Sequence, residues 1–141
     1  GFHVEAAVGS RRVPFLSSVR SRGKKEVIAL VHHELRREAI ELGVEVDTFG
    51  FGLPTLSNGM RRGLVPIVLI STFRLHKIRS PHWVVVTGLD RERVTIHDPY
   101  EAFYVHDSRK GRDVVVTRDE FVRMTSFGAS GFRAVVMVGA G

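Results

Sequence analysis

His82 and Asp98 lie near the two ends of the segment SPHWVVVTGLDRERVTIHDPY, residues 80–100. An imidazole can accept and return a proton near neutral pH, and a carboxylate that accepts a hydrogen bond from one ring nitrogen fixes the tautomer and favours the charged ring. Together the two groups would form the base and the orienting partner of a nucleophilic site. A His–Asp pair on a sheet is also a common structural pair, so the spacing alone leaves both interpretations open.

The sequence predicts a β-hairpin that brings the pair together. Two strands are expected on either side of a loop at residues 89–91. The apolar residues of the first strand share a face with His82, and those of the second share a face with Asp98. Matching these apolar faces, with Val86 opposite Val94, places His82 directly opposite Asp98. A slip of one residue would turn one apolar face away from its partner.

Hydrophobic periodicity and turn residues predict the other elements that position this hairpin. The clearest is an amphipathic helix over residues 24–42, which Gly43 ends. Thr117 and Glu120 form a capping box for a short helix through Met124. Another short helix is expected at 53–62, and strands are expected at 2–8, 44–49, 64–72, 82–88, 94–98, 112–116 and 132–138.

This order of elements predicts an α+β fold. One long helix comes before a mainly β second half, whose hairpin connections are too short for parallel crossovers. The prediction is a mostly antiparallel sheet with one long and two short helices. The nearly all-apolar strand at 64–72 is expected to be central, because it reads as buried on both faces.

Composition narrows the class of protein. The chain has 141 residues, of which 43% are hydrophobic and 26% charged, as in one ordinary globular domain. Its longest apolar runs are about half a dozen residues, too short to span a bilayer, and no secretory leader is visible. We therefore expect a cytoplasmic protein that does not enter a membrane.

The net charge of +6 comes largely from two basic runs, at residues 11–25 and 61–79. Such runs could bind nucleic acid. Solvated loops are the favoured interpretation, because no helix-turn-helix spacing and no aromatic RNA-binding signature accompany them.

Two absences bear on the chemistry. The chain contains no cysteine, which excludes a disulfide framework and a cysteine-based zinc site within it. The first methionine is Met60, and Gly1 already borders strand-like sequence. We therefore expect residues 1–141 to be most of a single domain that is truncated at its N-terminus.

Three motifs carry a resemblance to a known family. Gly63-Leu-Val-Pro66, His82-Trp-Val-Val-Val-Thr-Gly88 and Asp98-Pro99 resemble, in order and spacing, the C-terminal half of the bacteriocin-processing (double-glycine leader) peptidases. Residues 15–35 also resemble the stand-alone bacterial branch of that family. These proteins are papain-like cysteine peptidases, so the resemblance implies a papain-like fold and peptide-bond hydrolysis.

By resemblance, His82 is the general base and Asp98 orients it. The family's nucleophile is a cysteine that begins a helix near the N-terminus of the domain, shortly after an oxyanion-hole glutamine. Neither can be placed here, so the chain alone lacks the attacking thiolate. A peptide or protein substrate is implied, and no cofactor or metal is expected. The substrate contacts predicted around this site are Arg74, His76, Trp83 and Tyr100.

Other interpretations remain open. The same fold could serve as a non-catalytic module that binds a peptide or a partner. A serine could replace the cysteine, with Ser130 or Ser80 as candidates, although no helix of a nucleophile elbow follows Ser130. A metal site is also conceivable, and its ligands would be His76, His82, His97 and Asp98.

Overall fold

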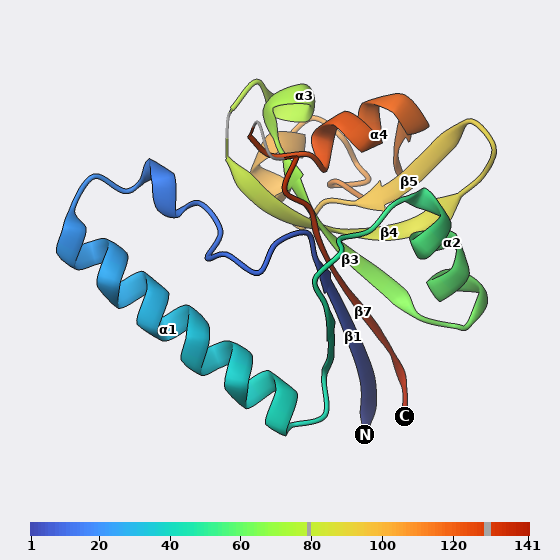
Figure 1. The fold of residues 1–141 in the computed structure, drawn as a ribbon. Helices are drawn as coiled ribbons and strands as arrows, with labels where there is room; N and C mark the ends of the chain where they lie inside the picture. Colours follow the sequence, from blue (N-terminus) through green and yellow to red (C-terminus); the bar gives the residue numbers. More distant parts are fainter. Residues whose placement is uncertain (79, 129–130) are drawn as a thin grey trace.

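In the computed structural model, residues 1–78, 80–128 and 131–141 are described, and seven strands of this part of the chain form one sheet (Figure 1). The strands are β1 Phe2–Val8, β2 Glu45–Asp47, β3 Val65–Ser71, β4 Pro81–Leu89, β5 Arg93–His97, β6 Val114–Thr117 and β7 Ala134–Ala140. The helices are α1 Arg22–Glu41, α2 Leu53–Arg61, α3 Phe73–His76 and α4 Arg118–Met124. Short 3-10 helices lie at Leu16–Ser18 and Glu101–Tyr104.

The sheet runs in the order β2-β1-β7-β3-β4-β5-β6. All neighbours are antiparallel except β1 and β2, which are parallel and are joined through α1. The α+β class, the mostly antiparallel sheet and the central place of β3 are confirmed. The prediction of two short helices was wrong, because the described residues contain three. The additional one, α3, lies in the segment that was expected to be a basic loop.

One face of the sheet carries the main core. Helices α2, α3 and α4 cover this face, and the fully buried Leu56 of α2 and Phe121 of α4 pack with the strand residues beneath them. Val68 of β3 and Val84 of β4 are fully buried there. Because side chains alternate along a strand, the same face also receives alternate residues of β4 from His82 up to its bulge, alternate residues of β5, and Asp98 directly after β5.

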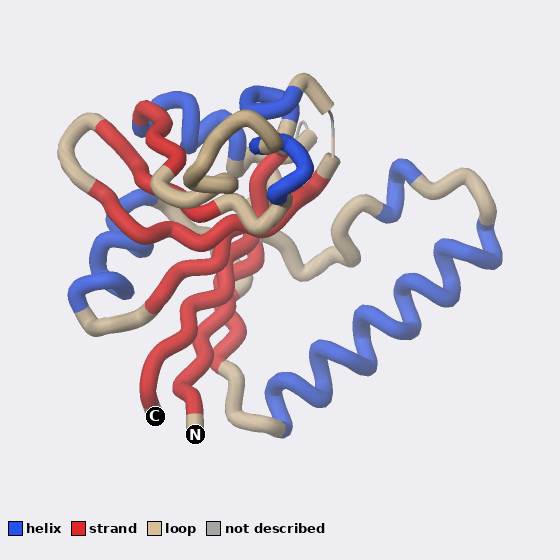
Figure 2. The backbone as a smooth tube through the Cα atoms, turned by 180° about the vertical axis from the view of Figure 1, so that it is seen from behind, coloured by secondary structure: helices blue, strands red, loops and turns tan. Residues whose placement is uncertain are grey.

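The long helix α1 stands away from the sheet. Ser21 caps its N-terminus by accepting the Lys24 N–H, and Arg37 pairs with Glu34 and Glu41 on its surface. None of its residues is buried, and the apolar stripe that periodicity predicted is exposed, with Val27 and Leu35 each 60% accessible. Figures 1 and 2 show the helix attached to the rest of the fold through the loops at its two ends.

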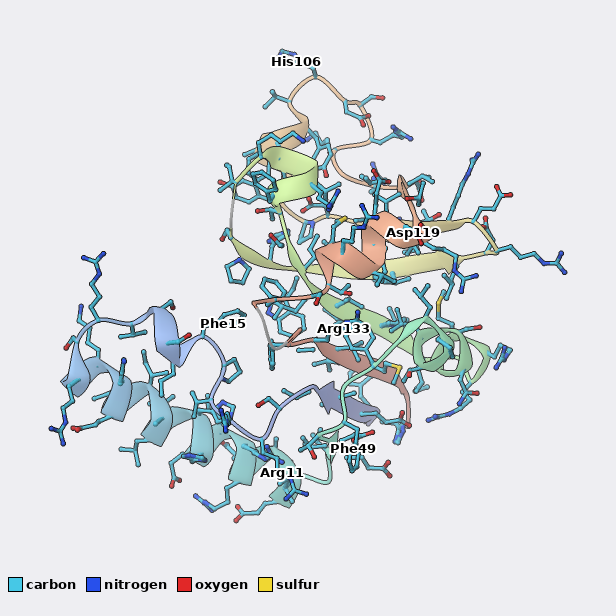
Figure 3. The ribbon with its side chains drawn as sticks, turned by 45° about the horizontal axis from the view of Figure 1, so that its top comes forward. Arg11, Phe15, Phe49, His106, Asp119 and Arg133 are labelled. Carbon is cyan, nitrogen blue, oxygen red and sulfur yellow. The ribbon has the colours of Figure 1, made fainter. Side chains whose placement is uncertain are left out.

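A small aromatic cluster fixes the loop that leads into α1. Phe15 reaches from this loop toward the sheet (Figure 3) and packs edge-on against Phe127 and Phe132, with ring centroids 5.4 and 5.6 Å apart. An open cavity of about 880 Å³ lies beside this cluster, between the loop and His33 of α1. The contact therefore ties the loop to Phe127 and Phe132, which lie between α4 and β7, while the helix stays apart.

The β4–β5 pairing differs from the predicted register. Val86 lies opposite Ile96 rather than Val94, and a bulge separates Val86 from Gly88. The three-residue loop spans residues 90–92. Its position is fixed because the Asp90 carboxylate accepts the backbone N–H groups of Glu92 and Arg93, at 2.8 and 2.7 Å. At Val86 the pairing is shifted by two positions, and an even shift keeps each apolar set on its face.

No helix in the described parts of the chain is long and apolar enough to cross a membrane.

Candidate active site

His82 and Asp98 meet at one end of the sheet, on the face that carries the main core. The two are not directly opposite, as the predicted register had them. Continuing the observed pairing by one residue places Asp98 beside Val84, so that His82 is its diagonal neighbour. A diagonal neighbour is within reach of a long side chain, and the His82 Nε2 atom lies 2.7 Å from Asp98 Oδ1.

Asp98 is the centre of the hydrogen-bond network. Its side chain is completely buried, and four donors surround its two oxygens. Oδ1 accepts from His82 Nε2 at 2.7 Å and from the Tyr100 N–H at 2.9 Å. Oδ2 accepts from His76 Nε2 at 2.9 Å and from the Tyr104 hydroxyl at 3.0 Å. A carboxylate offers about four acceptor positions, so this one is saturated.

These contacts keep Asp98 ionised. Burial alone raises the pKa of a carboxyl group, because it removes water from the charged form. The four hydrogen bonds stabilise that form and outweigh the effect of burial, so the pKa of Asp98 lies below its ordinary value. The site therefore holds a fixed negative charge at neutral pH.

Tyr104 acts in this network as a neutral donor. Burial raises the pKa of its hydroxyl, and the adjacent Asp98 charge raises it further, because a phenolate would face a carboxylate. The phenol therefore stays protonated over the ordinary pH range and donates to Asp98.

His82 is the imidazole that remains accessible. Its side chain is 21% exposed, whereas Asp98 beside it has no exposure. With Nε2 bound to the carboxylate, Nδ1 has no hydrogen-bond partner in the described residues. The ring of Tyr100 stands edge-on to the imidazole at 6.2 Å. One nitrogen is thus held by an anion while the other is available to accept a proton.

His76 is a second imidazole on the same carboxylate. It was predicted as a substrate contact, but its side chain is only 7% exposed. Its ring stacks on Phe103, with centroids 3.7 Å apart and planes inclined by 12°, and meets Tyr104 edge-on. The sequence grouped His76 with Asp98 only as a conceivable metal ligand, and it did not predict the contacts that Phe103 and Tyr104 make here.

Gly111 packs directly against the backbone of Asp98. Its carbonyl accepts the Asp98 N–H at 2.8 Å, and its φ of +82° lies in the left-handed region that glycine tolerates best. A Cβ at this position would clash with the Asp98 carbonyl oxygen and would lie 3.0 Å from the Tyr104 ring. The position therefore requires glycine if Asp98 is to stay in place.

The remaining predicted substrate contacts lie at different places. Arg74 is exposed on α3, and Tyr100, 49% exposed, borders His82. Trp83 is 42% exposed and pairs with Leu69, on the opposite face of the sheet from His82. Their roles as substrate contacts stay predictions.

The remaining candidates are the two serine nucleophiles and the metal site. Ser130 lies outside the described residues. The Ser80 hydroxyl donates to the Pro81 carbonyl at 3.3 Å. His97 points away from Asp98 and contacts Asp113 at 3.1 Å. In the described residues, no group of three or more His or acidic side chains is arranged to hold a metal ion.

Several basic side chains of the second basic run, residues 61–79, have partners within the fold. Arg62 forms an ion pair with Glu5 of β1, and Arg61 donates to Ser57 at 3.3 Å. The ammonium of Lys77 lies 5.9 Å from the ring centroid of Phe73. These contacts agree with the favoured interpretation of this run as a solvated part of the surface.

Comparison with known proteins adds one finding. The profile of a family described as "Peptidase_C39 like family" matches residues 1–139, nearly the whole chain. No curated protein and no solved structure matches the sequence.

Proposed function

The chain belongs to the Peptidase_C39 like family, and from that premise we propose that His82 and Asp98 are the base and the orienting residue of a papain-like cysteine-peptidase site. The observation that carries the proposal is the division of roles on the His82 ring. Nε2 is fixed by a buried carboxylate at 2.7 Å, while Nδ1 has no partner in the described residues and the ring is partly exposed. A general base needs this arrangement.

The proposed chemistry requires a thiol that these 141 residues do not contain. A cysteine from outside this sequence would lie against His82 Nδ1, lose its proton to that nitrogen and attack the peptide carbonyl. The imidazolium would then return the proton to the leaving amine. Asp98 would stabilise the imidazolium through Nε2 and hold the ring in position.

The proposed substrate is a peptide or protein in the cytoplasm. Tyr100 is the best placed of the predicted contacts, because its exposed ring borders the accessible side of His82. His76 has too little exposed surface for a substantial contact. Arg74 would contact the substrate from the exposed side of α3.

The test uses the complete gene product that contains this sequence. We expect one cysteine to react rapidly with iodoacetamide at neutral pH and peptide hydrolysis to depend on it. His82→Ala should lower both rates by about 100-fold or more, the usual contribution of a general base. His97→Ala is the matched control, because the polar partner of His97 among the described residues is the exposed carboxylate of Asp113, on the other face of the sheet. A product without cysteine, or rates that His82→Ala leaves unchanged, would contradict the proposal.

The absence of cysteine also favours a second candidate, a non-catalytic module that binds peptides on the same fold. In that case the complete product binds peptide without turnover and without a reactive thiol. Replacement of Arg74 and Lys77 by alanine should then weaken binding. Unchanged binding would remove the basic segment from the interaction.

A further inference from the structure

The two oxygens of Asp98 serve two different histidines. Oδ1 faces His82, the proposed base, and Oδ2 faces His76, which the proposed reaction does not use. Since a carboxylate can only accept, both imidazoles place an N–H on it through Nε2. His76 has little access to solvent, because its ring is stacked on Phe103.

The orientation of a carboxylate is weakly fixed by its own side chain. Rotation about the terminal bond of an aspartate has broad minima, so hydrogen bonds must determine where each oxygen points. Oδ2 has donors of its own in His76 and Tyr104. While these donors hold Oδ2, Oδ1 stays directed at His82.

The segment that carries His76 is itself fixed to the start of β4. Thr72 is 3% exposed, and its hydroxyl donates to the Ile78 carbonyl at 2.6 Å. Its backbone N–H donates to the Ser80 carbonyl at 3.1 Å, and its carbonyl accepts the His76 N–H at 2.8 Å. The short helix α3 is therefore closed onto the residues that lead into His82, and the His76 ring has a defined position.

We propose that His76 is a positioning residue, which holds Oδ2 of Asp98 so that Oδ1 remains engaged with the Nε2–H of His82. His76 does not touch substrate. The importance of this effect for catalysis rests on the proposed function, whereas the effect itself is a property of the folded 141-residue chain and can be measured without a nucleophile.

Two substitutions of similar polarity separate this role from a purely structural one. His76→Gln places an amide nitrogen at about the reach of Nε2, and His76→Asn falls one methylene short. The readout is the exchange of the His82 Nε2 proton with water, measured by NMR on ¹⁵N-labelled protein. We expect exchange at least about tenfold faster in the Asn variant, as for the loss of a hydrogen bond to a charged group. In the Gln variant it should stay within about threefold of the parent chain.

The control is His97→Asn, which should leave the His82 proton unchanged. Equal exchange in the parent chain and the Asn variant would overturn the proposal, as would equal acceleration in the Gln and Asn variants. If the Asn variant does not fold, the Gln variant decides, because a lost or tenfold faster signal there contradicts the role. None of these results depends on peptidase activity, so failure of the proposed function would leave them interpretable.

Discussion

Replacing Asp98 by asparagine removes the charge at the centre of the site without changing its shape. The two side chains are nearly isosteric, so the substitution opens no cavity. One acceptor oxygen becomes an NH₂ group that faces donors, either His82 and the Tyr100 N–H or His76 and Tyr104. A buried donor that loses its acceptor retains the cost of its desolvation.

The size of the effect follows from the number of bonds that cannot be rescued. If the NH₂ replaces Oδ2, the Tyr104 hydroxyl can rotate and a neutral His76 can change tautomer, so part of the network recovers. The bonds that stay with the oxygen become neutral, and a neutral hydrogen bond contributes about 0.5–1.5 kcal/mol, whereas one to a charged group contributes about 1.5–3 kcal/mol. We expect Asp98→Asn to lower the free energy of unfolding by about 2–4 kcal/mol at pH 7.

The pH dependence has a defined sign. The pKa of Asp98 is lower in the folded chain than in the unfolded chain, where it is about 3.9. The charge therefore stabilises the fold above about pH 4, and this contribution is lost as the pH falls through the still lower folded value. The difference between the parent chain and Asp98→Asn should begin to shrink below about pH 4.

Urea unfolding between pH 7 and pH 3 tests this reasoning. Asp113→Asn is the matched control, because Asp113 also contacts a histidine but its side chain is 65% exposed. That control should change stability by less than about 0.5 kcal/mol. A similarly small change in Asp98→Asn at pH 7, or a difference that does not vary with pH, would refute the idea that the buried charge organises the site.

Two further predictions concern the surroundings of the site. Gly111→Ala should cost about 3 kcal/mol or more in urea unfolding, because the added Cβ meets the Asp98 carbonyl as well as a left-handed φ. Gly43→Ala, with φ +84° and nothing within 4 Å, should cost only about 1 kcal/mol, and equal costs would contradict the clash. Amides of α1 should exchange with deuterated water much faster than those of β3, because helices in proteins owe most of their stability to packing of an apolar face and no residue of α1 is buried. Equal protection in the two elements would show that α1 is packed.

The strands show why faces were predictable and register was not. Alternation along β4 and β5 has a period of two, so it determines which residues share a face with His82 and Asp98. It does not distinguish registers that differ by two residues. The sequence did contain a signal, because Asp90 can cap the turn that follows it and thereby fix the loop at 90–92.

The long helix illustrates a different limit. Its periodic apolar residues and Gly43 predicted a helix over 24–42, and α1 spans Arg22–Glu41. Periodicity shows that a helix has an apolar side, but it does not show what that side contacts. In this chain the stripe meets nothing in the described residues that buries it.

The two sides of Asp98 differ in predictability for the same physical reason. His82 is carried by a strand, where a repeating pattern places its side chain on the face that Asp98 shares. His76 and Tyr104 come from a four-residue helix and a 3-10 turn, which are too short for any period to develop. Their positions depend instead on single contacts, such as the hydroxyl of Thr72 and the stacking on Phe103. A histidine in a basic loop gives no sign of such contacts in the sequence. Strand pattern alone therefore places His82 and Asp98 on one face, where they meet, and misses the other residues that bind the carboxylate.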